Sequence, residues 1–166
     1  QGIKLAKTKY VALVSNDTRP SPNWQEVARE VLSKPETFSC HFRMTNYDIP
    51  FSYGNETLYK GKERWCTAAF FVINKKYNLF FDEDYFNSFE DWDLFYRAVQ
   101  RGWHIAYTNK ACFQHHHSFT QKFVGFKGTA ENREYFKKKH GKDPDELLAD
   151  LYPDQVKQDY YGGFNI

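Results

Sequence analysis

Three short polar clusters in this chain carry side chains that could do chemistry, and each lies at the end of an apolar stretch or opens one. They are Asn-Asp-Thr at 16–18, Glu-Asp-Trp-Asp at 90–93 and His-His-His at 115–117. An aspartate and a histidine brought together can hold a divalent cation, and Mg²⁺ or Mn²⁺ is often bound by one or two carboxylates plus substrate phosphates. A separate carboxylate can act as a general base where it reaches the proton that it removes. The clusters therefore indicate an Asp/His site for Mn²⁺ or Mg²⁺, with a carboxylate available as a base.

Each cluster also has a structural explanation, which the sequence leaves open. Asp17 has the type and the place of an Asx turn at the end of a strand. Ser88 and Asp91 have the spacing of a capping box at a helix start. The histidines could form a solvated loop, because neighbouring side chains in a strand point to opposite faces and cannot all be ligands. A tetrahedral zinc site is less favoured, since the chain has neither a CxxC pair nor histidines four residues apart.

The composition narrows the class of protein. A chain of 166 residues fits one domain or a large piece of one, and a net charge of +2 gives no reason to expect nucleic-acid binding. The aromatic fraction of 19% exceeds what a core of this size needs, so we expect some rings to line a surface groove. Three cysteines without a CxxC pair favour buried thiols in a reducing compartment. No apolar run is long enough to span a membrane. We therefore expect a cytoplasmic protein, with peripheral attachment to a membrane left open.

Local patterns predict the elements that would position these clusters. The apolar run 10–14 predicts a strand buried on both faces, followed by a polar turn and a helix that begins at Ser21 with a proline after it. Apolar residues at three- and four-residue spacing predict a helix from about 90 to 100, which ends before Gly102. Further strands are expected at 37–44, 67–73, 103–107 and 111–114, helices at 129–140 and 145–151, and a long polar-aromatic loop at 45–65.

Four blocks of the chain, in their order and spacing, resemble the C-terminal part of glycosyltransferase family 2. They are AKTKYVALVSNDTRPSPNW at 6–24, the stretch from FFVINKK to FEDWDL within 69–94, the run from Gly-Trp to the histidines at 102–118, and NREYFKKKHG at 132–141. The resemblance implies an α/β fold of GT-A type, with a mixed, mostly parallel, partly Rossmann-like sheet flanked by helices. It also implies a catalytic core at 1–141, a helical tail at 142–166, and an N-terminal nucleotide-binding half that lies outside this chain or on a partner chain.

Carried over residue by residue, the resemblance implies a metal site and a diphosphate site. Asp17 would bind the Mn²⁺ or Mg²⁺ that bridges the diphosphate of a nucleotide-sugar, expected to be a UDP-sugar. Asn16 and Thr18 would line the same diphosphate site. His115 would be a further ligand of the metal or the diphosphate, with His116 or His117 as the alternative.

The resemblance also implies an inverting sugar transfer to an acceptor hydroxyl of a glycan or another molecule. Asp91 would be the general base that deprotonates this hydroxyl, and Glu90 would support Asp91 or contact the acceptor. Four aromatic residues would also line the acceptor side, namely Tyr53, Tyr59, Trp65 and Trp92. The carboxylate of Asp93 would lie there too and would orient the helix start.

Two other functions remain open on the sequence. Many family members carry two acids where this chain has Asn16 before Asp17, which favours a truncated or degenerate module that binds a glycan or a protein partner without catalysis. The third reading is a metal hydrolase built on Asp17 and the histidines, which would cleave a phosphoester without a sugar acceptor.

Overall fold

The computed structural model describes residues 2–59, 69–86, 88–116 and 129–151. The strands are β1 (Tyr10–Val14), β2 (Thr18–Pro20), β3 (Thr37–Asn46), β4 (Thr57–Leu58), β5 (Phe70–Asn74) and β6 (His104–His115). The helices are α1 (Gly2–Leu5), α2 (Trp24–Leu32), α3 (Glu90–Gln100), α5 (Thr129–His140) and α6 (Pro144–Leu151), with a 3₁₀ turn at Lys75–Tyr77. No helix of this part is long and apolar enough to cross a membrane.

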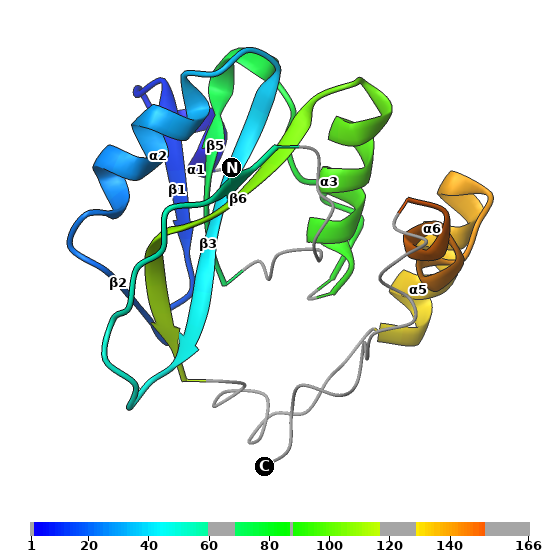
Figure 1. The fold of residues 1–166 in the computed structure, drawn as a ribbon. Helices are drawn as coiled ribbons and strands as arrows, with labels where there is room; N and C mark the ends of the chain where they lie inside the picture. Colours follow the sequence, from blue (N-terminus) through cyan, green and yellow to red (C-terminus); the bar gives the residue numbers. More distant parts are fainter. Residues whose placement is uncertain (1, 60–68, 87, 117–128, 152–166) are drawn as a thin grey trace.

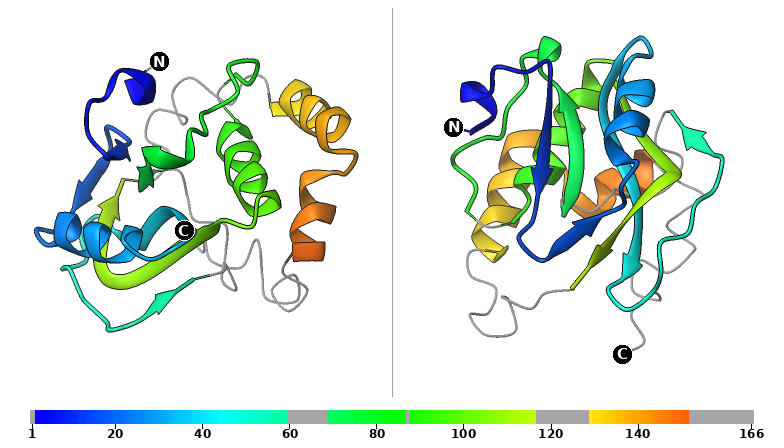
Figure 2. Two further views of the ribbon diagram at one scale, coloured as in Figure 1. Left: turned by 90° about the horizontal axis from the view of Figure 1, so that it is seen from above. Right: turned by 90° about the vertical axis from the view of Figure 1, so that its left-hand side faces the viewer.

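The strands form a sheet in the order β1-β5-β3-β6-β2, and β4 pairs with β6 outside this path. Only β3 and β6 pair in parallel among the described strands; the β1–β5, β3–β5, β2–β6 and β4–β6 pairs are antiparallel. A short turn joins β1 to β2, although they stand at opposite ends of this order, so the sheet curls into a nearly closed barrel (Figure 2). The predicted GT-A-type fold is therefore wrong, because its sheet would be open and mostly parallel, whereas this one is nearly closed and mostly antiparallel.

The error has a physical source in the apolar runs. A strand buried in a parallel sheet and a strand buried between antiparallel neighbours both read as a short continuous apolar run, so periodicity does not show direction. β1 has antiparallel β5 beside it and is only partly buried, where the sequence predicted burial on both faces. No apolar run in the sequence predicts β2. This strand also contains Pro20, a residue that strands tolerate chiefly at sheet edges.

Several boundaries follow the predictions, and two differ in an informative way. The predicted limits of β1 and α5 agree with the structure, and β3 runs two residues further than predicted. The two predicted strands at 103–107 and 111–114 are one strand, β6. The helix expected at Ser21 begins at Trp24, because the buried Ser21 hydroxyl donates to Asn23 Oδ1 and accepts from the Cys112 N–H. Ser21 thus ties the turn to β6 instead of capping the helix.

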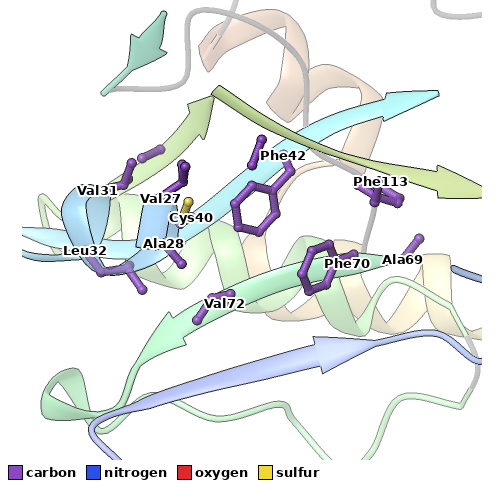
Figure 3. Close-up of a cluster of buried hydrophobic side chains, with 12 residues drawn as sticks. Val27, Ala28, Val31, Leu32, Cys40, Phe42, Ala69, Phe70, Val72 and Phe113 are labelled. Carbon is purple, nitrogen blue, oxygen red and sulfur yellow. The ribbon is translucent and has the colours of Figure 1, made fainter. Parts of the chain in front are cut away.

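Helices cover both faces of the sheet, which creates separate apolar cores (Figure 1). The core under α2 contains Val31, Cys40, Phe42 and Phe70 among others (Figure 3). The core under α3 contains Phe38, Phe71, Leu94 and Phe95 among others. A third cluster joins α3 to α5 and α6, with Tyr85, Phe136 and Leu147 buried in it. Helix α3 therefore lies between the sheet and the C-terminal helices.

His41 lies in the middle of this packing. Its ring stacks on Phe71 and meets the Phe95 ring edge-on, at centroid distances of 5.1 and 4.8 Å, and its Nε2 is 3.0 Å from Ser39 Oγ. The side chain is fully buried, and burial lowers the pKa of His41 from 6.5 to about 3. The folded protein therefore keeps this imidazole neutral at a pH where the unfolded chain protonates it.

We expect this difference to make the fold sensitive to acid. Between pH 6.5 and about 3 the unfolded state binds one proton more than the folded state at His41, so stability falls by up to about 1.4 kcal/mol per pH unit as the pH decreases. His41→Phe should flatten this slope in urea unfolding measured at pH 7 and pH 4.5. Phe38→Leu, which changes another fully buried ring of the core under α3 and removes no titratable group, is the matched control and should keep the parental slope. An equal slope for the parent and His41→Phe would contradict the assignment.

Candidate functional site

Asp17 and His115 meet where β1, β2 and β6 come together. β2 pairs with the end of β6, which puts Thr18 opposite His115 and Asp17 one residue before it. Asp17 Oδ1 lies 3.2 Å from His115 Nε2, and both side chains are partly buried. The His116 N–H donates to the Asp17 carbonyl at 2.9 Å, which fixes the backbone of the turn. The structure thus brings together the two residues that the sequence predicted as metal ligands.

The other residues of the polar turn and the histidine run have distinct positions. Asn16 is exposed, and the Thr18 hydroxyl donates to the Ser15 carbonyl at 2.8 Å. The His116 ring lies 4.9 Å from the Tyr47 ring. His117 lies outside the described residues. The side chain that accompanies Asp17 is therefore that of His115.

The pair offers one carboxylate and one imidazole to a cation. Among the side chains that the structure describes, no group of three or more His, Cys, Asp or Glu residues is arranged to hold a metal. Mg²⁺ or Mn²⁺ bound through one carboxylate and the oxygens of a substrate phosphate does not require a third acid from the protein. The donor set of Asp17 and His115 therefore fits such an ion in the presence of a diphosphate, and it does not fit a structural zinc site.

Glu90 and Asp91 open helix α3, but not through the predicted capping box. The N-cap residue is Phe89, in a left-handed conformation with φ 64° and no side-chain cap. Ser88 uses its hydroxyl to accept from Asn132 instead. Asp91 Oδ1 accepts from the N–H of its neighbour Trp92 at 2.9 Å. The capping-box explanation of Ser88 and Asp91 is therefore wrong, and Asp91 is left for another role.

The environment of Asp91 disfavours its charged form. Burial, as the larger cause, and the negative charge of Glu90 together raise the pKa of Asp91 from 3.8 to about 7, against the smaller lowering effect of backbone N–H groups. Glu90 Oε2 is itself buried and has no hydrogen-bond partner in the described part of the chain. A carboxyl group perturbed by burial and by a like charge is typical of functional sites. With a pKa near neutrality, Asp91 can accept a proton and release it again.

The two sets of residues face the same end of the molecule. β1 and β6 both run towards the lower end in Figure 1, and α3 begins at that end before it runs upwards. Asp17 and His115 lie at the ends of these strands, and Asp91 lies in the first turn of α3. The fold therefore directs the candidate metal ligands and the candidate base to one side.

The predicted acceptor-side residues that the structure describes do not form one group. Tyr53 is 53% exposed in the connection before β4. Tyr59 packs against the core under α2, away from the face that α3 covers. Trp65 lies outside the described residues. Trp92 contacts the Phe89 ring at 5.8 Å, and the carboxylate of Asp93 is fully buried.

Asp93 joins α3 to α5 through charged partners. Its carboxylate lies 2.7 Å from Arg97 Nε, 2.7 Å from Lys139 Nζ and 2.8 Å from His140 Nε2. Lys139 also contacts Asp82 in the loop before α3. These contacts bind helices to each other rather than facing solvent.

Sequence reasoning missed the polar face of α5. Asn132, Tyr135, Lys139 and His140 recur at helical spacing and all contact α3 or the loop before it. The missed signal was the separation of three and four residues between Asn132, Tyr135 and Lys139, with His140 beside them, which places these side chains in one stripe along the helix. It was missed because the stripe is polar, and polar residues at this spacing are usually read as a solvated face.

Comparisons with protein-family models and with curated proteins return no match for this chain. The likeness to glycosyltransferase family 2 therefore rests on the four sequence blocks.

Proposed function

We propose that this chain is the diphosphate and acceptor side of a metal-dependent, inverting glycosyltransferase. It would move a sugar from a UDP-sugar to a hydroxyl of a glycan or a similar acceptor. The observation that carries the proposal is the carboxyl group of Asp91, whose pKa is raised to about 7 in the first turn of α3. The Asp17–His115 pair at the same end of the molecule supports it. Cys112 is a buried thiol outside any disulfide, which fits a reducing, cytoplasmic setting.

Each residue then has a chemical task. The ionised Asp91 carboxylate accepts the proton of the acceptor hydroxyl while the oxygen bonds to the anomeric carbon of the sugar. The bond from that carbon to the nucleotide diphosphate breaks on the opposite face, so the anomeric configuration inverts. Glu90 keeps the proton affinity of Asp91 high through its charge. Asp17 and His115 would hold the divalent cation, which supplies positive charge to the departing diphosphate.

The direct test is sugar transfer itself. The purified protein, together with any N-terminal half or partner chain that supplies the nucleotide pocket, is incubated with a panel of UDP-sugars, Mn²⁺ and glycan acceptors. Formation of a glycoside of inverted configuration, detected by NMR, is the expected result. Release of phosphate from simple phosphoesters without an acceptor would instead favour the hydrolase reading.

Loss of the Asp17 carboxylate should remove metal binding. We expect Asp17→Ala to weaken Mn²⁺ binding by tenfold or more in calorimetry with UDP present, because the chain loses its one hard oxygen ligand in the pair. Asp48→Ala removes an exposed acid from the loop after β3 and serves as the matched control. Unchanged Mn²⁺ affinity in Asp17→Ala would place the metal elsewhere.

A second candidate is a glycan-binding or protein-binding module without catalysis. The single acid of the polar turn favours it, because Asn16 stands exposed where a second carboxylate would strengthen a metal site. Mn²⁺ binding that depends on Asp17 would argue against this candidate. Glycan binding without Mn²⁺ dependence and without transfer would favour it.

A further inference from the structure

The residue that precedes helix α3 has a strained backbone conformation. Phe89 has φ 64° and ψ −5°, a left-handed conformation that bulky residues rarely adopt. Such a conformation persists only where the surroundings fix it, and it recurs at functional sites. Directly after it come Glu90 and Asp91, the carboxylate pair at the helix start. The contacts that hold Phe89 in this conformation therefore influence the orientation of Glu90 and Asp91.

Asn132 of α5 holds Phe86 and Ser88, two described residues just before Phe89. Asn132 is buried, with 5% of its surface exposed. Its Oδ1 accepts from the Phe86 N–H at 3.3 Å, and its Nδ2 donates to the carbonyls of Phe86 and Ser88. Nδ2 also lies 3.0 Å from the Ser88 hydroxyl. A carboxamide uses both its acceptor and its donors here, which a residue with only one kind of group cannot do.

The strained turn is connected to the helix by the backbone. The Phe89 carbonyl accepts the Asp93 N–H at 2.9 Å, so the orientation of this peptide starts the helical hydrogen bonds. The Phe89 ring also packs near Phe136 of α5, with centroids 6.3 Å apart. Helix α5 thus touches the turn on its backbone and on its side chain.

We propose that Asn132 is a positioning residue for the Glu90–Asp91 pair. It holds Phe86 and Ser88 so that Phe89 stays left-handed and both carboxylates leave the turn in their partly buried positions. The use of Asp91 as a base rests on the proposed function, but the role of Asn132 in placing the pair does not. Asp93 also ties the first turn of α3 to α5 through Lys139 and His140, but these contacts do not involve residue 132 or the segment before Phe89.

The test measures the site directly and needs no substrate. Asn132→Leu keeps a similar side-chain volume, adds no charge and removes every hydrogen bond to the segment. We expect amide exchange at Phe86 and in residues 88–91 to become about tenfold faster or more, because these bonds limit local opening. In NMR titration, the apparent pKa of Asp91 should fall by at least one unit as the carboxyl group gains access to water, with Glu90 titrated in the same spectra. Lys138→Ala, on the exposed face of α5, should change neither.

A second variant separates positioning from general loosening of α5. Phe89→Gly removes the penalty of the left-handed conformation, since glycine adopts it freely. Loss of Asn132 should therefore speed exchange in residues 88–91 less in the Phe89→Gly background than in the parent. Equal effects in both backgrounds would overturn the proposal, as would an unchanged pKa of Asp91 in Asn132→Leu.

The two proposals can fail separately. A lowered pKa of Asp91 in Asn132→Leu, in a protein that transfers no sugar, would uphold the positioning role and reject the transferase. Sugar transfer that depends on Asp91, together with a pKa of Asp91 that does not change in Asn132→Leu, would uphold the transferase and reject the positioning role of Asn132.

Discussion

Asp91→Asn should lower the rate of sugar transfer by about 10²–10⁴-fold, the range expected for loss of a general base. Asparagine has nearly the same size and can still accept from the Trp92 N–H, so the helix start should remain in place. The binding of Mn²⁺ and of a UDP-sugar should stay close to that of the parent, because Asp17 and His115 are unchanged. Parental turnover in Asp91→Asn would show that Asp91 is not the base.

The pH dependence of kcat/KM is an independent test of Asp91 as the base. A base works in its ionised form, so kcat/KM of the parent should rise as the pH increases towards about 7 and level off above it. Glu83→Gln changes an exposed acid of the same stretch and should keep this profile. A rate that does not vary between pH 5.5 and 8.5 would contradict a base with this pKa.

The same substitution should make the protein more stable. The folded state raises the pKa of Asp91 above its unfolded value of 3.8, so its favourable contribution is complete below that value and is lost as the pH rises through about 7. Above pH 7 the buried charge therefore destabilises the parent, and Asp91→Asn should gain up to about 4 kcal/mol in urea unfolding at pH 8. At pH 3 the two proteins should be equally stable. A gain in stability with a loss of activity is the behaviour expected of a residue kept for function.

Local signals in the sequence were enough for the limits of several helices and strands, although not for the fold class. The apolar run of β1 and the limits of α5 agree with the structure, and α3 ends as predicted before Gly102, whose φ is 75°. These features depend on neighbours within one or two turns of chain. The meeting of Asp17 and His115 was also predictable, because both follow strands that run in one direction.

Features that depend on distant partners were not predictable from spacing. The position of β5 between β1 and β3 is set by the packing of both faces, and the apolar run at 70–73 fits either strand direction. Ser88 has the type of a capping residue, but its hydroxyl is taken by Asn132 of α5. Asp93 looks like one more acid of the helix start, and only the fold brings Lys139 and His140 to it.

Asp93→Ala should cost about 3–5 kcal/mol, the range for breaking a buried ion pair by removing one partner. The carboxylate is fully buried, and its loss leaves the cations of Arg97 and Lys139 without it. Lys139 keeps its contact with Asp82, so the cost should fall towards the lower end of this range. Urea unfolding at pH 7 measures the change, and hydrogen exchange should show that α5 loses protection first.

The matched control is an acid of the same stretch whose ion pair is exposed. Glu83 pairs with Lys4 at 3.3 Å, with side chains 65% and 55% exposed. Glu83→Ala should therefore cost at most about 1 kcal/mol. A cost for Asp93→Ala no larger than this would show that α5 does not depend on the buried carboxylate. Asp91 and Asp93 stand two residues apart in one helix, yet their substitution should move stability in opposite directions at pH 8. The difference arises because the fold supplies Asp93 with cations, whereas it takes Asp91 out of water and sets it beside the like charge of Glu90.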